Sequence, residues 1–196
     1  GTTLHTRPES EDVLGGCGAR DTRRHSASAS GRPPTAGIRR PRGDRFIPLA
    51  ARRVGMRVTF LGTGSAMPLA DRHQTGLLVD EGGRYLLVDC GAGVLHRLEE
   101  TGVGAENVST VLLTHHHLDH VSDLMALLKA RWLAGEEHLQ VVGPRGTKAL
   151  VDGLLDVHDY LDGRVDLSVR EVGEQSFEVA GFAVEAHRTE HSKECL

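Results

Sequence analysis

The sequence predicts a mixed α/β protein, and three observations support that prediction. From Met56 onward, short apolar runs alternate with segments of helical spacing in the order β-β-β-α-β-α-β-α-β-β-β. Turn-forming residues, many of them glycine, separate these segments. The β-branched run Val108 to Leu113 leads directly into Thr114 to His120, which holds four histidines and an aspartate. We therefore expect layers of helix and sheet, with chemically active side chains at one strand end.

Alternating or β-branched apolar residues predict the strands, and spacing of three and four predicts the helices. The first strand ends in the turn Gly62-Thr63-Gly64-Ser65, and the next two form a hairpin because residues 80–84 have turn chemistry. Glycines at 102 and 135 are expected to end the first two helices. The expected strands are 57–61, 77–79, 85–88, 108–113, 140–142, 165–169, 176–179 and 182–186, and the expected helices begin at Val94 and span 122–134 and 147–157.

Residues 1–55 differ from the rest and are expected to be a disordered or non-native N-terminal extension. They contain 11 arginines and no lysine against 5 acidic residues, with few apolar residues to form a core. A transit peptide or a nucleic-acid-binding tail would also be arginine-rich, but acidic residues interrupt the basic character here. The chain begins with glycine, and Met56, its first methionine, directly precedes the first strand. The predicted domain is therefore 56–196.

Composition narrows the class of protein. Residues 56–196 carry 12 lysines and arginines against 22 acidic residues, a balance that disfavours tight binding of nucleic-acid phosphates. The three cysteines are widely spaced, which fits no disulfide framework and favours a cytoplasmic location. No apolar run approaches the roughly 20 residues that span a bilayer, so no membrane partner is expected.

The histidine cluster has the spacing H-x-H-x-D-H. In an extended chain, residues two apart point the same way, so His115 and His117 can hold one ion while His116 points away. Asp119 and His120 lie one step further on and could reach a second ion. Borderline metals such as zinc prefer these ligands. The alternative is a solvated histidine-rich loop, and the ordered spacing after a strand disfavours it.

Three segments resemble the metallo-β-lactamase superfamily, and within it the ribonuclease Z-like branch. The cluster at 114–120 is similar to the superfamily's metal motif, and residues 56–68 are similar to the first strand and loop of that branch. Residues 86–91, Leu-Leu-Val-Asp-Cys-Gly, resemble the strand whose aspartate supports the metal ligands. The resemblance implies a four-layer αββα sandwich, of which this sequence fits the first half plus part of the second.

The resemblance also implies roles for individual residues. His115, His117 and a later histidine would bind the first metal; His191 is preferred for the third position and His187 is the alternative. Asp119 and His120 would bind the second metal, and Asp119 is the candidate catalytic residue that orients or deprotonates the attacking water. Asp89 would support the ligands from behind, although a strand-end aspartate can simply cap a turn. The implied cofactor is Zn²⁺, two ions in the complete protein, with Mn²⁺ or iron as alternatives. No substrate-binding residue is assigned.

The implied activity is hydrolysis of a phosphodiester through a metal-bound hydroxide, with RNA or a small ester or phosphodiester as substrate and a homodimer as the assembly. A thioester or lactone hydrolase of the same fold is one alternative, because fold does not choose substrate. The family completes its site with a bridging aspartate and a last histidine beyond the position of His191. The domain is therefore expected to be incomplete at the C-terminus, and a catalytically inactive metal-binding fragment is the second alternative.

Overall fold

A six-stranded mixed sheet forms the framework of the domain. The computed structural model describes residues 55–191 and 195–196. The prediction for residues 1–55 therefore lies outside the described residues, apart from Gly55. The strands are β1 (Arg57–Gly62), β2 (Gly76–Glu81), β3 (Arg84–Val88), β4 (Thr110–Leu112), β5 (His138–Gly143), β6 (Asp166–Glu171), β7 (Gln175–Val179) and β8 (Phe182–Ala186). The helices are α1 (Val94–Glu100), α2 (Leu118–Val121), α3 (Leu124–Leu133) and α4 (Thr147–Val157), with single 3₁₀ turns η1 (Ala105–Asn107) and η2 (Asp159–Leu161).

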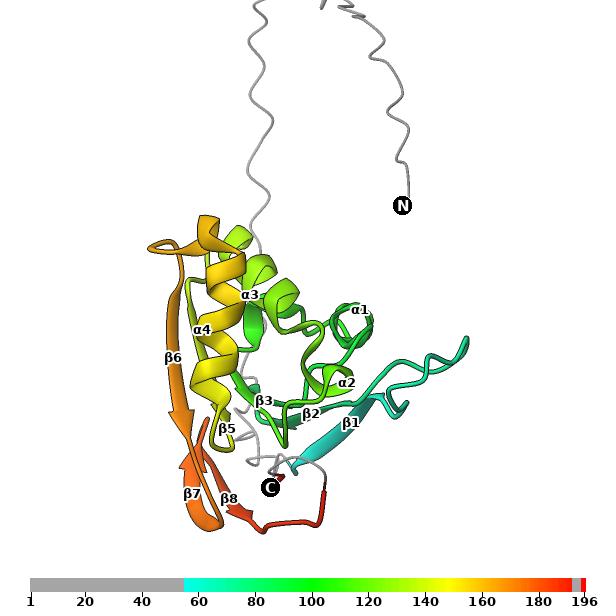
Figure 1. Ribbon diagram of the computed structural model, residues 1–196. Coiled ribbons are helices and arrows are strands. Elements are labelled where there is room, and N and C mark those ends of the chain that lie inside the picture. Colours follow the sequence, from blue (N-terminus) through cyan, green and yellow to red (C-terminus); the bar gives the residue numbers. More distant parts are fainter. Residues whose placement is uncertain (1–54, 192–194) are drawn as a thin grey trace, which may run out of the picture. The chain divides into compact units, whose positions relative to one another are not determined.

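The sheet order follows the chain from β1 to β6. β1, β2 and β3 pair antiparallel, whereas β3, β4, β5 and β6 pair parallel. The β2–β3 hairpin turns at Gly82 and Gly83, which have φ of 65° and 83° and so use the left-handed conformation that two-residue hairpins need. Each parallel step requires a crossover, and α1, α3 and α4 supply them (Figure 1). The predicted element order is confirmed, except that two helices, α2 and α3, stand between β4 and β5 where one was expected.

Two apolar cores lie on opposite faces of this sheet because strand side chains alternate. Leu87, Val111 and Val141 face the helices and are fully buried. Their neighbours Leu86 and Val142 face the other way and pack with the β7–β8 hairpin. Figure 1 shows this hairpin as a separate pair of strands near the end of β6. The layers are helix, sheet and hairpin, which is the predicted α/β class.

Several predicted boundaries are wrong by one or two residues, and two of these errors lie beside the histidine cluster. The helix expected at 122–134 starts at Leu124, and a separate short helix, α2, precedes it. Asp123 separates them, since its backbone N–H donates to the Cys90 carbonyl and its carboxylate accepts from Leu95 N. The strand expected at 108–113 is only Thr110–Leu112. The backbone N–H of Val108 donates to the Ala105 carbonyl and so belongs to the 3₁₀ turn η1. The backbone N–H of Thr114 donates to the Asp89 carboxylate instead of to a neighbouring strand.

None of the helices in the described ranges combines the length and the apolar character needed to cross a membrane.

Candidate metal centre

The candidate centre lies where β3 and β4 end. Their parallel pairing aligns Val88 with Leu112, so the residues that follow each strand meet at one edge of the sheet. The segment 113–117 between β4 and α2 is called the histidine loop. Its first residue, Leu113, donates its backbone N–H to the Val142 carbonyl, which fixes the start of the loop against β5. Gly91 permits the close approach from the β3 side, because a β-carbon there would lie 2.0 Å from the Asp119 carbonyl oxygen. The histidine loop is therefore held by backbone contacts on both sides.

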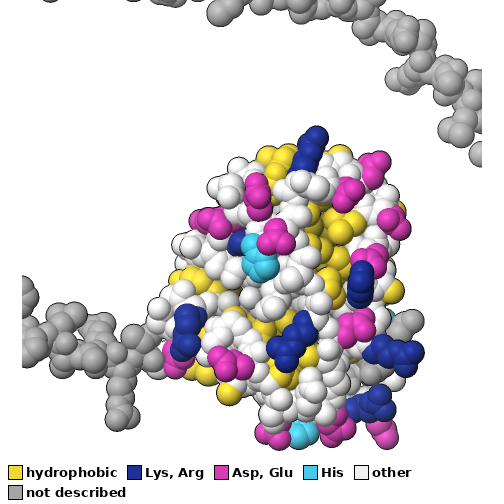
Figure 2. Space-filling model, turned by 90° about the vertical axis from the view of Figure 1, so that its left-hand side faces the viewer, with side chains coloured by type: hydrophobic (Ala, Val, Ile, Leu, Met, Phe, Trp, Pro, Cys, Tyr) yellow, Lys and Arg dark blue, Asp and Glu magenta, His cyan; other side chains and the backbone are white. Residues whose placement is uncertain are grey.

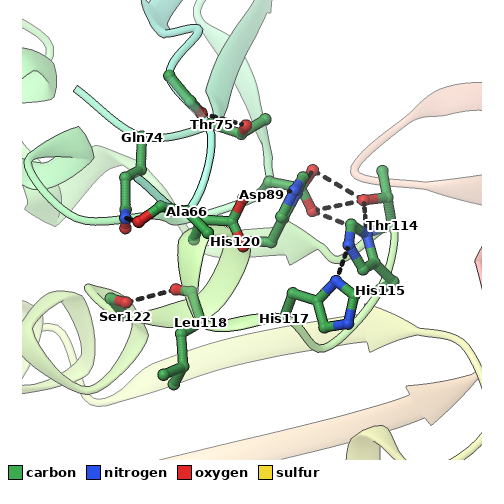
Figure 3. Close-up of polar contacts among 12 residues, drawn as sticks. Ala66, Gln74, Thr75, Asp89, Thr114, His115, His117, Leu118, His120 and Ser122 are labelled. Carbon is green, nitrogen blue, oxygen red and sulfur yellow. Dashed lines mark hydrogen bonds and ion pairs between the residues drawn. The ribbon is translucent and has the colours of Figure 1, made fainter. Parts of the chain in front are cut away.

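Asp89 connects the two strand ends through its carboxylate. The residue is 2% exposed and has φ of 61°, an unusual conformation for a residue other than glycine. Its oxygens accept hydrogen bonds from Thr114 N at 2.8 Å and from Thr114 Oγ1 at 2.8 Å. The Oδ2 atom also lies 2.7 Å from His120 Nδ1 (Figure 3). Asp89 thus contacts the first and the last residue of the histidine cluster, Thr114 and His120.

Three histidines bring their ring nitrogens together on one side of the loop. The candidate ligand atoms of His115, His117 and His191 all lie within 4.8 Å of one another. His115 Nε2 is 3.1 Å from His117 Nδ1, and Figure 3 shows these two rings side by side. The ring centroid of His191 lies 4.5 Å from that of His115 and 4.8 Å from that of His117. His191 reaches the loop from the segment after β8, which is far away in sequence.

Asp119 and His120 form a second, smaller set. Asp119 Oδ2 lies 3.6 Å from His120 Nε2, and the His120 ring centroid is 4.0 Å from that of His115. The hydrogen bond to Asp89 uses Nδ1 of His120, which leaves Nε2 directed to the side on which Asp119 lies. Asp119 is buried, and His120 is partly exposed. The two sets are adjacent, as the spacing of the motif predicts.

Two histidines of this centre have opposite pKa shifts. Burial first, and then the charges of the nearby His120 and His191, lower the pKa of His115 to about 4 against the opposing charge of Asp89. Burial also opposes the charged form of His120, but the hydrogen bond and charge of Asp89, together with the charge of Asp119, outweigh it and raise its pKa. His115 is therefore a neutral imidazole at neutral pH, which is the form that binds metals.

The geometry of the three-histidine set fits a metal ion. Two nitrogens bound to tetrahedral zinc at about 2.0–2.1 Å lie roughly 3.3 Å apart. The separation of 3.1 Å between His115 Nε2 and His117 Nδ1 is close to that value. His115 also places Nδ1 3.1 Å from Thr114 Oγ1, and such a contact fixes the orientation of a ligating ring. Asp119 and His120 offer one oxygen and one nitrogen nearby, a set that suits the same class of ions.

The structure also locates the alternatives left open by the sequence. His187 is exposed and lies 3.2 Å from Glu185 instead of beside His115. His116 points to Thr147 and so away from the other rings. Cys90 is fully buried, and burial raises the pKa of its thiol, which is expected of a small packing residue. Sequence reasoning missed Thr114, although its position directly before the cluster was a signal.

The described domain matches known proteins in sequence. Residues 56–195 match the family model described as Anti-Pycsar protein Apyc1. The ribonuclease Z of Mycobacterium marinum is 41% identical over 135 residues, covering 55% of this chain and 48% of that protein. The ribonuclease Z of Mycobacterium avium is 47% identical over 108 residues, covering 52% and 39%. The chain spans about half the length, or less, of these curated relatives.

Solved structures match in fold. The metallo-β-lactamase fold protein YhfI from Bacillus subtilis aligns with a TM-score of 0.58 at 27% identity, covering 71% of this chain and 55% of that chain. The short form of human tRNase Z aligns with a TM-score of 0.55 at 25% identity, covering 70% and 61%. The described residues therefore have the metallo-β-lactamase fold predicted from the sequence. Since the family model covers well over half of its residues, the chain belongs to the Anti-Pycsar protein Apyc1 family.

Proposed function

We propose that the chain is a metal-dependent hydrolase that cleaves phosphodiesters, with RNA as the first candidate substrate. The observation that carries this proposal is the convergence of His115, His117 and His191 within 4.8 Å, beside Asp119 and His120. By their names, the curated relatives and the human structure act on RNA and on tRNA. The chain covers only part of those proteins, so their activity supports the proposal by similarity alone.

In the proposed site, His115, His117 and His191 hold the first ion, and Asp119 and His120 hold the second. Zinc is the first choice of metal because it favours imidazole and carboxylate ligands, with manganese or iron as alternatives. Bound ions would lower the pKa of a coordinated water and offset the charge that develops on the attacked oxygen. Both functions require ligands with fixed orientation, and the contacts of Asp89 with Thr114 and His120 provide it.

Asp119 is the proposed catalytic residue. It is 8% exposed, and its Oδ2 lies 3.6 Å from Nε2 of His120, whose ring centroid is 4.0 Å from that of His115. A carboxylate there can accept a hydrogen bond from the attacking water and take its proton. Exchange to Asn would keep the shape and remove the basic oxygen. We expect the Asp119→Asn variant to lose activity more strongly than it loses its first metal ion.

Substrate preference is the direct test of the proposal. Precursor tRNA, a small phosphodiester such as bis(p-nitrophenyl) phosphate, and a thioester are compared with and without chelator, using His117→Ala as the inactive control. The proposal predicts chelator-sensitive cleavage of a phosphodiester that the control lacks. Exclusive thioester cleavage would favour the alternative hydrolase, and metal binding without any cleavage would favour a non-catalytic metal-binding fragment.

The charge distribution makes the RNA part of the test informative. On the described face that includes β6 and α4, acidic and basic side chains are interspersed and no basic stripe forms (Figure 2). RNA binding by phosphate contacts alone would need such a stripe. Residues 56–196 as a whole carry 12 lysines and arginines against 22 acidic residues. If RNA is the substrate, we therefore expect its recognition to depend on the metal centre, so that His117→Ala weakens RNA binding as well as cleavage.

The family description favours a second candidate function. The chain belongs to a family described by an anti-Pycsar role, and the match includes every residue of the proposed centre. In this function, the same hydrolytic site would counteract Pycsar. Pycsar activity is measured with the wild-type chain and with His117→Ala. Equal inhibition by both proteins would exclude a role for the metal centre.

Three further expectations belong to the proposal. The domain is taken to start at Met56, the assembly to be a homodimer, and the location to be cytoplasmic.

The homodimer can be tested on β1. Val58 and Phe60 on this strand are 48% and 65% exposed, which gives an apolar surface for association. Sedimentation of the wild-type chain and of Phe60→Glu tests the homodimer. A monomer at micromolar concentration would exclude it.

A further inference from the structure

His116, the middle histidine of the cluster, has a partner outside the metal centre. Its Nε2 atom lies 2.8 Å from Oγ1 of Thr147, the first residue of α4. His115 and His117 on either side turn their rings toward each other. An extended chain produces this alternation, so the loop presents two rings to the metal centre and one ring to α4.

The hydroxyl of Thr147 defines the direction of this hydrogen bond. Thr147 is fully buried, and its Oγ1 donates to the Pro144 carbonyl at 2.7 Å. A hydroxyl has one proton to donate, and that proton is used by Pro144. Thr147 therefore accepts from His116, so the Nε2 atom of His116 carries the hydrogen.

The segment that receives His116 is held in place from several sides. Glu171, at the end of β6, accepts hydrogen bonds from Gly146 N at 2.9 Å and from Lys148 N at 3.0 Å. Gly146 has φ of 97°, and a β-carbon there would lie 3.5 Å from Cε1 of His116, so the ring lies against the backbone. A β-carbon on Gly143 would lie 2.5 Å from Thr147 Oγ1. The hydroxyl is thus a fixed acceptor.

We propose that His116 is a positioning residue that anchors the histidine loop to the start of α4. Asp89 holds the loop through Thr114 on one side, and His116 holds it through Thr147 on the other. The residue between these anchors is His115, and the next residue after His116 is His117. Two fixed points would hold the two imidazoles at a separation that suits one ion. This inference rests on the proposed function because it assumes that the loop binds metal.

The test compares variants that keep or remove this hydrogen bond; Thr147→Val also removes the hydrogen bond from Thr147 Oγ1 to the Pro144 carbonyl, whereas the His116 variants leave that bond in place. His116→Gln keeps an N–H donor near the position of Nε2, whereas His116→Leu removes it. Thr147→Val removes the acceptor, and Thr147→Ser is the matched control that keeps it. Zinc affinity is measured by competition with a chromophoric chelator, and Tm is measured on the metal-free proteins. ¹⁵N NMR of the metal-free wild type reports whether His116 carries its hydrogen on Nε2.

We expect His116→Leu and Thr147→Val each to lower zinc affinity by about tenfold. That is the lower end of the loss seen when a residue that supports a metal ligand is removed. His116→Gln and Thr147→Ser should bind zinc nearly as well as wild type, and the His116→Leu/Thr147→Val double variant should be no weaker than either single variant. Equal affinity of His116→Leu and wild type would overturn the proposal. So would an equal loss in His116→Gln, or losses that simply follow the Tm of the metal-free proteins.

The two proposals fail in different ways. A chain that binds zinc with the expected ranking of variants and cleaves no substrate would refute the proposed function and leave the role of His116 intact. A wild-type chain that binds no zinc would refute both.

Discussion

The three-histidine set and the Asp119–His120 pair differ in how the fold assembles them. His115 and His117 need His191, which arrives from the segment after β8, to complete a set within 4.8 Å. Asp119 and His120 are neighbours in sequence and lie 3.6 Å apart within one short helix. The first set depends on tertiary structure, and the second depends on local geometry and on Asp89. Among the described residues, the first set offers more ligands, so we expect it to bind its ion more tightly.

The largest expected effect comes from removing the tertiary ligand. His191→Ala leaves His115 and His117 without the third ring. Removing a residue that hydrogen-bonds to a metal ligand lowers metal affinity by roughly 10–100-fold, and removing the ligand itself should lower it more. We expect zinc affinity at the tight site to fall more than about 100-fold. His187→Ala is the matched control, because His187 is exposed beside Glu185 and should leave affinity unchanged. His120→Ala should reduce the number of ions bound while keeping the tight one.

Asp89→Asn should affect both sets. The variant loses the charged acceptor for Thr114 and His120, and zinc affinity should fall by about 10–100-fold. Hydrogen bonds to charged groups contribute about 1.5–3 kcal/mol, so the free energy of unfolding should fall by roughly that amount. Chelator competition and urea unfolding measure the two effects. An unchanged zinc affinity would show that Asp89 only caps its turn.

Protonation should distinguish the two sets in the metal-free protein. NMR titration should place the pKa of His115 at about 4 and that of His120 above its ordinary value near 6.5. Unfolded chains bind more protons at His115 than folded chains do between about pH 4 and 6.5, so this residue destabilises the fold as pH falls through that window. His120 acts oppositely, and its contribution is complete below about pH 6.5 and is lost as pH rises through its folded pKa. Identical pKa values for the two histidines would contradict this distinction.

The smallest expected effect is at Glu171, outside both sets. Hydrogen bonds from Lys148 N and Gly146 N lower the pKa of its carboxyl. Its contribution to stability is therefore present above an unfolded pKa near 4.3 and is lost as pH falls through the folded value. Glu171→Gln should lower Tm slightly at pH 7, and the difference from wild type should vanish in acid. A constant difference across pH would show that the charge has no role.

Much of the fold was predictable because local patterns and tertiary structure agree. The β2–β3 hairpin follows from a glycine pair between apolar runs, and α4 matches its predicted range of 147–157. The errors occurred where tertiary contacts override local preference. Asp123 breaks a helical pattern because its polar groups bind Cys90 and Leu95, and the sequence holds no sign of those partners.

The candidate site was predictable in part for the same reason. The spacing of His115, His117, Asp119 and His120 is a local property and could be interpreted directly. The choice between His187 and His191 depends on where the chain turns after β8, which spacing alone does not determine. The contact of His116 with Thr147 joins residues 31 positions apart, and only the structure reveals it.

Zinc titration of the metal-free chain, with competing chelator and metal analysis, tests whether His115, His117 and His191 form the principal metal site. We predict one tightly held ion per chain, a second held at least about tenfold more weakly, and loss of the tight ion in His191→Ala. Two ions of equal affinity, or a tight ion that persists in His191→Ala, would contradict the assignment of the two sets.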